Sequence, residues 1–259
     1  MIEVGIVGMC VIGTHVAKAI DNGIPGIALA GVSVRTAAKA GAYPMFSIAE
    51  LIERADLVVE AATQTALREF GPAVLEAGKH LMVLSVGGLV GVLDEWTRIA
   101  DAHRCRILIP SGAIAGLDGV KGAREGAITS VTMETRKPPR GLAGAPYIAA
   151  RGIDLDAIRE ETLIFEGSAT QAVKAFPANV NVVAALSLAG LGPERTRIKV
   201  FAVPGQQTNR HRIAIEGEFG RLVMEVENVP SENPRTGKLS YLSAIAMLRE
   251  LGSPMRVGS

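Results

Sequence analysis

The sequence is poor in cysteine and in aromatic residues, and neither sign of charge predominates. Its 259 residues include 2 cysteines and 1 tryptophan, and aromatic residues make up 4%. Cys10 and Cys105 are too few for a disulfide framework and fit no metal-ligand spacing, so we expect free thiols and no bound metal. The 27 basic and 26 acidic side chains nearly cancel, and the basic ones are scattered, which argues against a nucleic-acid partner.

Long hydrophobic runs are also missing. A stretch such as residues 182–189 is shorter than the roughly 20 apolar residues that span a bilayer. The N-terminus lacks the basic region and long apolar region of a signal peptide. We therefore expect a soluble, cytoplasmic protein without membrane contact.

The first half of the chain alternates short apolar runs with stretches of helical spacing. The runs are continuously apolar, as in strands covered on both faces, so we expect a parallel sheet with helices on each side. This is a Rossmann-type, doubly wound α/β domain, for which we predict residues 1–116. The expected strands are residues 3–7, 27–34, 57–61, 81–85 and 106–109, and the expected helices are residues 12–22, 47–54, 65–77 and 93–103.

The second half has a different rhythm, which predicts an α+β domain with a mostly antiparallel sheet at residues 117–238. Two prolines force residues 137–142 into a loop. A last helix over residues 239–251, within a C-terminal segment 239–259, could return to the first domain. The other predicted elements are strands at residues 128–135, 197–203, 209–216 and 221–229 and a long Ala-rich helix at residues 171–191 that Pro177 interrupts early.

A partial glycine motif follows the first strand. A dinucleotide site has glycines at the first, third and sixth positions of this turn, for a tight turn, close approach of the pyrophosphate and close helix–strand packing. Gly8 and Gly13 occupy the first and sixth, but Cys10 occupies the third, where its side chain would crowd the approach and exclude most positive-φ conformations. The strand–turn–helix context still predicts dinucleotide binding at the turn, including Val11 and Ile12.

The end of the second strand bears on the choice between NAD and NADP. It lacks the carboxylate that would bind the 2′-hydroxyl of NAD, and has Ser33, Arg35 and Thr36 instead. Because an arginine can bind a 2′-phosphate through two hydrogen bonds, Arg35 slightly favours NADP. A solvated charge at a helix start would explain Arg35 equally simply.

Several ordered strings resemble the L-aspartate dehydrogenase family across essentially the whole chain. The resemblance implies a homodimer of subunits with a Rossmann domain and a second domain whose sheet contributes to the subunit contact. It also implies oxidation of L-aspartate to iminoaspartate with NAD or NADP, feeding NAD biosynthesis. The strings are residues 60–64, 111–118, 136–139, 176–182, 209–211 and 227–234.

Particular residues match the family's motifs within these strings. His211 matches the active-site histidine, and Asn181 matches a cofactor-contacting asparagine. Ala115 matches a backbone contact to the cofactor, with Ala113 as the alternative if the register differs, and Ala62 is a further expected contact. Cys10 and the missing carboxylate depart from the family's pattern in the cofactor half only.

Histidine suits this chemistry because the ammonium of aspartate must lose a proton before hydride can leave Cα. We expect Arg210 and Arg212 to lower the pKa of His211 and keep it neutral, although an exposed edge position is the alternative for His211 from sequence alone. The two carboxylates of the substrate need cations or N–H donors. We favour Lys137, with Arg210 and Asn181 as further contacts, over Arg140, Arg235, Lys238 and the N–H groups of residues 111–113 at an expected helix start.

Two other functions remain open. A related enzyme could reduce another small imine or carbonyl compound with the same dinucleotide domain. Alternatively, the chain could be a regulatory or structural dimer that binds a dinucleotide without catalysis, with Cys10 as the sign of lost activity.

Overall fold

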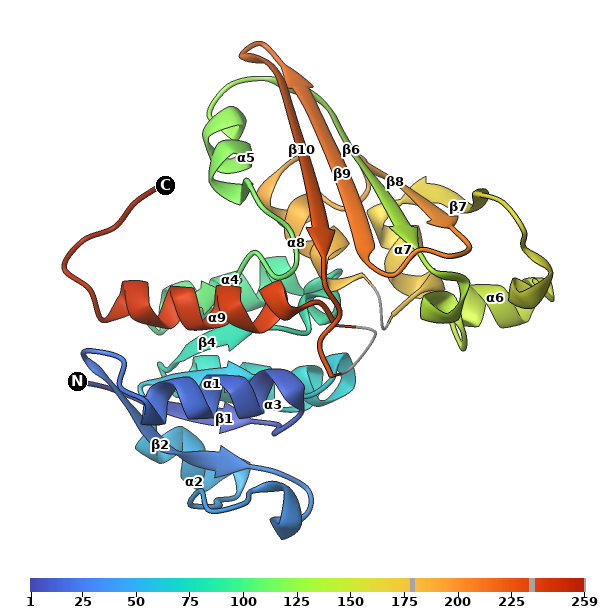
Figure 1. Cartoon of the computed structure of the whole chain (residues 1–259). Helices are drawn as coiled ribbons and strands as arrows, with labels where there is room; N and C mark the ends of the chain where they lie inside the picture. The colour runs from blue at the N-terminus through green and yellow to red at the C-terminus, as the bar shows by residue number, and fades with distance from the viewer. Residues whose placement is uncertain (178–179, 233–235, 259) are drawn as a thin grey trace. The chain divides into compact units, whose positions relative to one another are not determined.

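The computed structural model describes residues 1–177, 180–232 and 236–258 of the chain. They fold into two compact units (Figure 1), one formed by Met1–Pro110 with Ser240–Val257 and the other mainly by Ser111–Leu239. The division lies at Pro110, whereas the sequence pattern places it after residue 116. The intervening loop is fixed to the second unit, since Asn228 donates a hydrogen bond to the carbonyl of Ala113.

The first unit contains a parallel five-stranded sheet in the order β2-β1-β3-β4-β5, which confirms the predicted doubly wound class. Its strands are β1 Ile2–Val7, β2 Ile27–Ser33, β3 Leu57–Glu60, β4 His80–Val83 and β5 Ile107–Leu108. Its helices are α1 Val11–Asp21, α2 Ile48–Arg54, α3 Gln64–Glu76 and α4 Leu93–Ala102, with most of α9 Lys238–Leu251. Short 3-10 turns lie at Ala37–Lys39 and Val86–Leu89.

Helices cover both faces of this sheet. On one face, Val4 and Ile6 of β1 pack with Val16 of α1 and Leu248 of α9 in a fully buried core. The rings of His15 and Tyr241 stack at 4.0 Å and join α1 to α9. The continuous hydrophobicity of the strands therefore reflects burial from both sides.

The second unit contains a mixed sheet in the order β10-β9-β6-β8-β7. The β6–β8 pair is parallel and the other neighbouring pairs are antiparallel, which confirms a mostly antiparallel sheet. Its strands are β6 Ile128–Lys137, β7 Thr162–Ser168, β8 Thr196–Ala202, β9 Asn209–Gly217 and β10 Gly220–Asn228, and its helices are α5 Leu117–Arg124, α6 Pro146–Arg151, α7 Ala169–Ala175 and α8 Asn181–Ala189. Short 3-10 turns lie at Pro139–Leu142 and Leu155–Ala157.

The interruption expected at Pro177 divides the predicted helix over residues 171–191 into two separate helices. Helix α7 ends at Ala175, and Phe176, with φ −137° and ψ 57°, leaves the helical region before Pro177. Proline disfavours the helical conformation in the preceding residue and lacks the N–H that would continue the helix. A second helix, α8, begins at Asn181. Strand β7, which the sequence analysis did not predict, forms the edge of the sheet next to β8.

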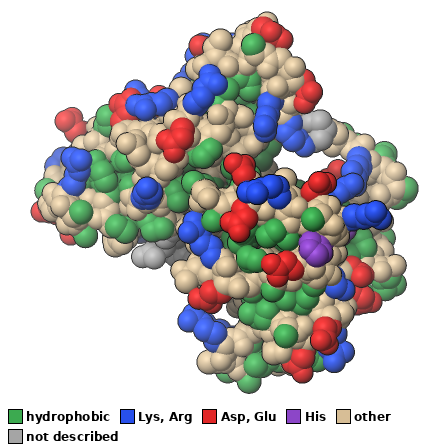
Figure 2. All heavy atoms as spheres, turned by 180° about the vertical axis from the view of Figure 1, so that it is seen from behind, with side chains coloured by type: hydrophobic (Ala, Val, Ile, Leu, Met, Phe, Trp, Pro, Cys, Tyr) green, Lys and Arg blue, Asp and Glu red, His purple; other side chains and the backbone are tan. Residues whose placement is uncertain are grey.

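The helix-facing side of this sheet is the core of the second unit. Met133 of β6, Ile213 of β9 and Leu186 of α8 are fully buried there. The other side carries partly exposed charged residues in ion pairs, among them Arg136 with Glu134 at 2.8 Å and Arg212 with Glu225 at 3.2 Å. Figure 2 shows that acidic and basic side chains are interspersed on the face it presents, which fits the near-zero net charge.

Candidate active site

The turn between β1 and α1 has the backbone shape of a phosphate-binding loop. Gly8 has a φ of +93°, and a Cβ there would lie 2.6 Å from the carbonyl oxygen of Ala61. A Cβ on Gly13 would collide with the carbonyl oxygen of Gly8. No side chain caps the N-terminus of α1, so its first N–H groups, at Val11, Ile12 and Gly13, are available to an anion. The turn therefore fits a dinucleotide.

The conflict expected at Cys10 does not arise. Cys10 is the N-cap of α1 with φ −77° and ψ −171°, an extended conformation that any residue can adopt. Its thiol is turned toward the third strand and donates a hydrogen bond to the carbonyl of Ala61, with Sγ 2.9 Å from the oxygen. A third glycine is unnecessary here because the position does not need a positive φ.

At the end of β2, the backbone of Ser33 holds the turn and the basic side chain is exposed. The carbonyl of Ser33 accepts a 2.9 Å hydrogen bond from the N–H of Gly8. Arg35 and Thr36 follow on the surface, and within the described parts of the chain no carboxylate forms an ion pair with Arg35. The guanidinium is thus available to solvent and to a ligand.

A buried carboxylate that the sequence analysis did not single out lies at the end of β3. Glu60 has no exposed surface. Its Oε1 accepts hydrogen bonds from the N–H of Ala62 at 2.7 Å and the hydroxyl of Ser85 at 2.9 Å. Its Oε2 accepts the N–H groups of Leu84 at 3.2 Å and Ser85 at 2.7 Å. Burial raises the pKa of this carboxyl, and the hydrogen bonds oppose that rise.

In the second unit, buried polar side chains gather at one end of the sheet. The β6–β9 register places Thr135 opposite His211, and the β10–β9 register places Asn228 opposite Asn209. These four residues and Lys137 are each at least 94% buried. Because residues two apart on a strand share a face, Thr135 and Lys137 lie on the same side of β6.

His211 lies on a central strand, between β10 and β6, which excludes the exposed-edge alternative. Thr135 Oγ1 is 3.1 Å from His211 Nδ1. Burial, and secondarily the positive charge of Lys137, lowers the pKa of His211 to about 3. Burial alone lowers the pKa of Lys137 to about 8.

The expectation that the flanking arginines depress this pKa is wrong. Arg210 and Arg212 point to the opposite face of β9, where their Nε atoms lie 3.2 Å from carboxylate oxygens of Glu227 and Glu225. Neighbouring residues on a strand alternate in direction, so Arg210 does not share the face of His211. A hollow of about 710 Å³ lies among these paired charges, and residues from β6, β9 and β10 line it.

The loop of residues 111–116 and the start of α8 lie near each other in the same unit. A Cβ on Gly112 would be 3.5 Å from Cγ1 of Val182, one residue after Asn181. Ala113 is buried and bonded to Asn228, whereas Ala115 is exposed. The loop therefore contacts both the first turn of α8 and the end of β10.

Two expectations about helices in this region are corrected. Residues 111–113 do not start a helix, because α5 begins at Leu117 with Gly116 as its N-cap. Asn181 is the first residue of α8 and does not lie within a longer helix. Of the other predicted residues, Arg140 is exposed, and Arg235 lies outside the described residues, as do residues 178–179 and 233–234 of two family-like strings.

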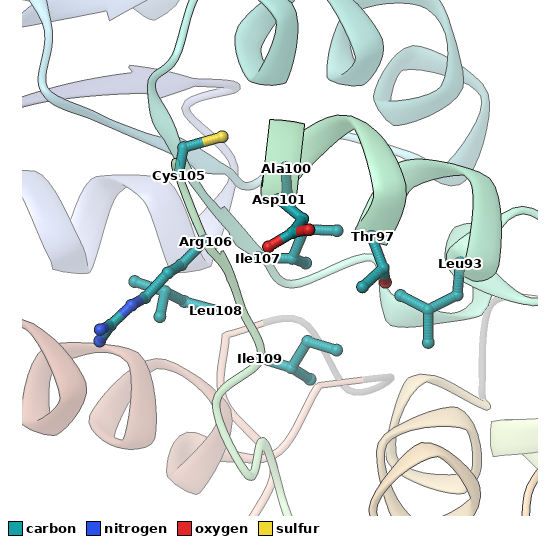
Figure 3. A pocket seen from close by; sticks show the side chains of 9 residues that line it. All are labelled: Leu93, Thr97, Ala100, Asp101, Cys105, Arg106, Ile107, Leu108 and Ile109. Atoms are coloured by element: carbon teal, nitrogen blue, oxygen red, sulfur yellow. The ribbon is translucent and has the colours of Figure 1, made fainter. Parts of the chain in front are cut away.

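Another cavity, of about 350 Å³, lies in the first unit between α4 and the strand β5 (Figure 3). Its side chains include Leu93, Thr97, Asp101 and Arg106, and it contains none of the predicted site residues. Within the described residues, no group of three or more His, Cys, Asp or Glu side chains could hold a metal ion. None of the described helices is both long enough and apolar enough to cross a membrane.

Comparisons with known proteins give matches for both units of the chain. Residues 118–251 match the family model of the aspartate dehydrogenase C-terminal domain, and residues 8–110 match that of the homoserine dehydrogenase NAD-binding domain. The chain is 45% identical to an L-aspartate dehydrogenase of Methanosarcina barkeri, with 100% of each covered. It is 44% identical to an L-aspartate dehydrogenase of Bradyrhizobium diazoefficiens, with 100% of this chain and 94% of that protein covered.

Solved structures share the fold. A crystal structure of aspartate dehydrogenase from Thermotoga maritima has a TM-score of 0.78 at 24% identity, with 100% of both chains covered. A hyperthermophilic archaeal homoserine dehydrogenase in complex with NADPH has a TM-score of 0.60 at 13% identity, with 98% of both chains covered. The first unit of this chain matches an NAD-binding domain, and the chain is 44–45% identical to the Methanosarcina and Bradyrhizobium relatives along its whole length. The chain therefore belongs to the L-aspartate dehydrogenase family of oxidoreductases.

Proposed function

We propose that this protein oxidises L-aspartate to iminoaspartate with a nicotinamide dinucleotide, and that His211 accepts the proton from the substrate's ammonium group. The observation that carries the proposal is a histidine held neutral in a buried site, with Thr135 at its Nδ1. An ammonium group cannot release hydride from Cα until it has lost a proton. A neutral imidazole can take that proton, which is general base catalysis.

Thr135 selects the nitrogen that does this work. In the proposed tautomer, Nδ1 carries the hydrogen and donates it to Thr135 Oγ1, 3.1 Å away. Nε2 then has the lone pair and accepts the substrate's proton. The lowered pKa, about 3, leaves this nitrogen unprotonated in the free enzyme at neutral pH. The carboxylates of a bound aspartate would raise this pKa toward the range in which a histidine accepts a proton.

Lys137 supplies positive charge for a carboxylate of aspartate. It is 5% exposed, and with a pKa of about 8 it is mostly protonated at neutral pH. An anionic substrate would offset part of the cost of burying this charge. Arg210, on the other face of β9, is no longer part of the proposed substrate site. Asn181 remains a candidate contact to substrate and cofactor.

The dinucleotide site is proposed at Gly8, Cys10, Val11, Ile12, Gly13 and Ala62, and Ala115 and Asn181 are further proposed contacts to the cofactor. When bound, the dinucleotide supplies the redox chemistry by accepting hydride from Cα. The exposed guanidinium of Arg35 and the missing carboxylate after β2 favour NADP over NAD.

The protein is further proposed to act as a cytoplasmic homodimer that feeds NAD biosynthesis. The charged, helix-free side of the second sheet is the surface we assign to the subunit contact. Its Arg–Glu pairs could be satisfied by the same surface of a second copy, as two-fold symmetry requires. Light scattering on the purified protein would measure the mass directly.

The test is to follow reduced nicotinamide by absorbance, with L-aspartate and either NAD or NADP. Activity that is lost in His211→Ala and kept in Arg212→Ala, its neighbour on the opposite face, would support the proposal. Dinucleotide binding without aspartate turnover would favour a reductase for another small imine or carbonyl compound. Absence of both binding and turnover would favour a regulatory or structural dimer whose dinucleotide site has been lost.

A further inference from the structure

We propose that Glu60 is a positioning residue of the cofactor site, whose carboxylate fixes the two loops that face the nicotinamide half of the dinucleotide. This inference rests on the dinucleotide-binding part of the proposed function and not on the identity of the substrate. The two loops are residues 61–63, after β3, and residues 84–86, after β4.

Sheet topology places Glu60 at the binding edge. In a doubly wound sheet the dinucleotide lies outside the carboxyl ends of the strands, at the point where the strand order reverses. The order β2-β1-β3-β4-β5 puts that point between β1 and β3. Glu60 is the last residue of β3 and pairs with Val7 at the end of β1 and Val83 at the end of β4.

The same topology assigns Glu60 to the nicotinamide side. The adenine ribose contacts the end of the second strand, and the pyrophosphate lies at the N-terminus of the first helix. The nicotinamide half therefore extends the other way, over the ends of β3 and β4. The loops whose N–H groups donate hydrogen bonds to the Glu60 carboxylate are the ones that follow these strands.

Each of the two carboxylate oxygens of Glu60 accepts two of the four hydrogen bonds. One oxygen joins Ala62 to the Ser85 hydroxyl, and the other takes the N–H groups of Leu84 and Ser85. A single side chain thus ties together loops separated by more than 20 residues of sequence. Within the described residues no Lys or Arg forms an ion pair with Glu60, so these donors alone compensate its burial. Burying a carboxylate costs more free energy than burying an apolar side chain, which indicates that its hydrogen bonds have a function.

The loop after β3 also supports the glycine turn. Ala61 packs against Gly8, since a Cβ on Gly8 would lie 2.6 Å from the carbonyl oxygen of Ala61. The same oxygen accepts a hydrogen bond from the Cys10 thiol. The N–H of Ala61 donates to the carbonyl of Val7 at 2.8 Å. These contacts are made by backbone atoms of Ala61 and not by the Glu60 carboxylate, so the pyrophosphate turn keeps them when the carboxylate is replaced.

Glu60→Gln tests this without changing the side chain's size. Glutamine has one oxygen and one NH₂ group, so it cannot accept all four donors. If the NH₂ replaces Oε2, the N–H of Ser85 loses its acceptor and faces a donor, and the N–H of Leu84 keeps only the backbone carbonyl of residue 60. If it replaces Oε1, the Ser85 hydroxyl can rotate to accept, and the N–H of Ala62 alone loses its partner. The second orientation costs less, and it releases the loop after β3.

The measurement is the affinity for NADH and for AMP, which contains the adenine half only, in the full chain without aspartate. We expect Glu60→Gln to weaken NADH binding about tenfold, the loss of one charged hydrogen bond, and to leave AMP binding unchanged. Ser85→Ala removes one of the four donors and should weaken NADH binding about threefold by the same argument. It carries the test if Glu60→Gln does not fold.

Equal losses for NADH and AMP, or no loss in a folded variant, would overturn the proposal. A purely structural role would lower thermal stability without separating the two ligands. Since aspartate is absent from the assay, a wrong substrate assignment leaves the result intact. If the wild-type protein binds none of NADH, NADPH and AMP, the dinucleotide site itself is wrong.

Discussion

The hydroxyl oxygen of Thr135 lies 3.1 Å from Nδ1 of His211, across the antiparallel β6–β9 pair, and both side chains are about 96% buried. The hydroxyl can donate to or accept from Nδ1, and in either case it occupies that nitrogen. The pairing fixes the orientation of the ring and determines which nitrogen is left for a substrate.

Replacing this hydroxyl should slow catalysis more than it changes substrate binding. Thr135→Val keeps the shape but removes the hydrogen bond, and we expect kcat to fall about three- to tenfold with little change in KM. Thr135→Ser keeps the hydroxyl and should stay within about twofold of the wild type. Nitrogen-15 NMR of the imidazole should show hydrogen on Nδ1 in the wild type and a mixture of tautomers in Thr135→Val. A wild-type rate and an unchanged tautomer in Thr135→Val would contradict the assignment.

Removing the charge of Lys137 should affect the affinity for aspartate. Lys137→Met keeps most of the apolar stem, and we expect the KM for aspartate to rise about 10- to 100-fold, as for the loss of a charged hydrogen bond. The matched control is Lys199→Met, a partly exposed lysine whose Nζ lies 3.8 Å from Glu166 on the other face of the sheet. An equal effect of both variants would rule out a specific role for Lys137.

The pKa of Lys137, which lies near His211, predicts a pH dependence of aspartate binding. With a pKa of about 8, Lys137 loses its charge as the pH rises through that value. The KM for aspartate should therefore increase above pH 8 and stay flat over that range in Lys137→Met. Loss of the positive neighbour should also raise the pKa of His211, but it should remain below 6.5 because burial is the larger cause of the shift. Steady-state kinetics over this pH range would measure the first effect, and proton NMR titration of the four histidines would measure the second.

His211 should also make the fold sensitive to acid. Its pKa is about 3 in the folded chain against an ordinary value of 6.5, so between these pH values the unfolded chain binds a proton that the folded chain does not. Folding stability then falls as the pH falls, by up to about 1.4 kcal/mol per pH unit. Urea unfolding of the wild type and of His211→Gln at several pH values between 4 and 7 would isolate this slope, which should be shallower in the variant by roughly that amount. Parallel curves would show that His211 is not neutral in the folded protein.

Much of the first unit followed from local patterns in the sequence. Its strands are buried on both faces and therefore read as continuous apolar runs, and the positions of Gly8 and Gly13 marked the turn. The role of Glu60 was not visible, because its partners at residues 84–85 lie about 25 positions further along the chain. A charge at the end of an apolar run looks the same in sequence whether it faces water or two loops.

In the second unit, strand alternation alone predicts which of the expected site residues share a face. Arg210 and His211 are adjacent on β9 and so must face opposite sides, whereas Thr135 and Lys137, two apart on β6, must share one. The break between α7 and α8 was also signalled by Pro177. What sequence alone could not supply is the register that sets Thr135 against His211, because 76 residues separate them.

The choice of cofactor should depend on Arg35. If its guanidinium binds the 2′-phosphate of NADP, Arg35→Ala should weaken NADP binding about 10- to 100-fold and leave NAD binding nearly unchanged, since NAD has no phosphate at that position. The matched control is Arg98→Ala, an exposed arginine on α4 whose only recorded bond within the described residues is to the carbonyl of Asp94. Affinities for both cofactors, measured by fluorescence of the reduced forms at one ionic strength, give the selectivity as a ratio. A ratio that Arg35→Ala leaves unchanged would mean that this arginine is a solvated surface charge, and that NADP, if preferred, is recognised elsewhere.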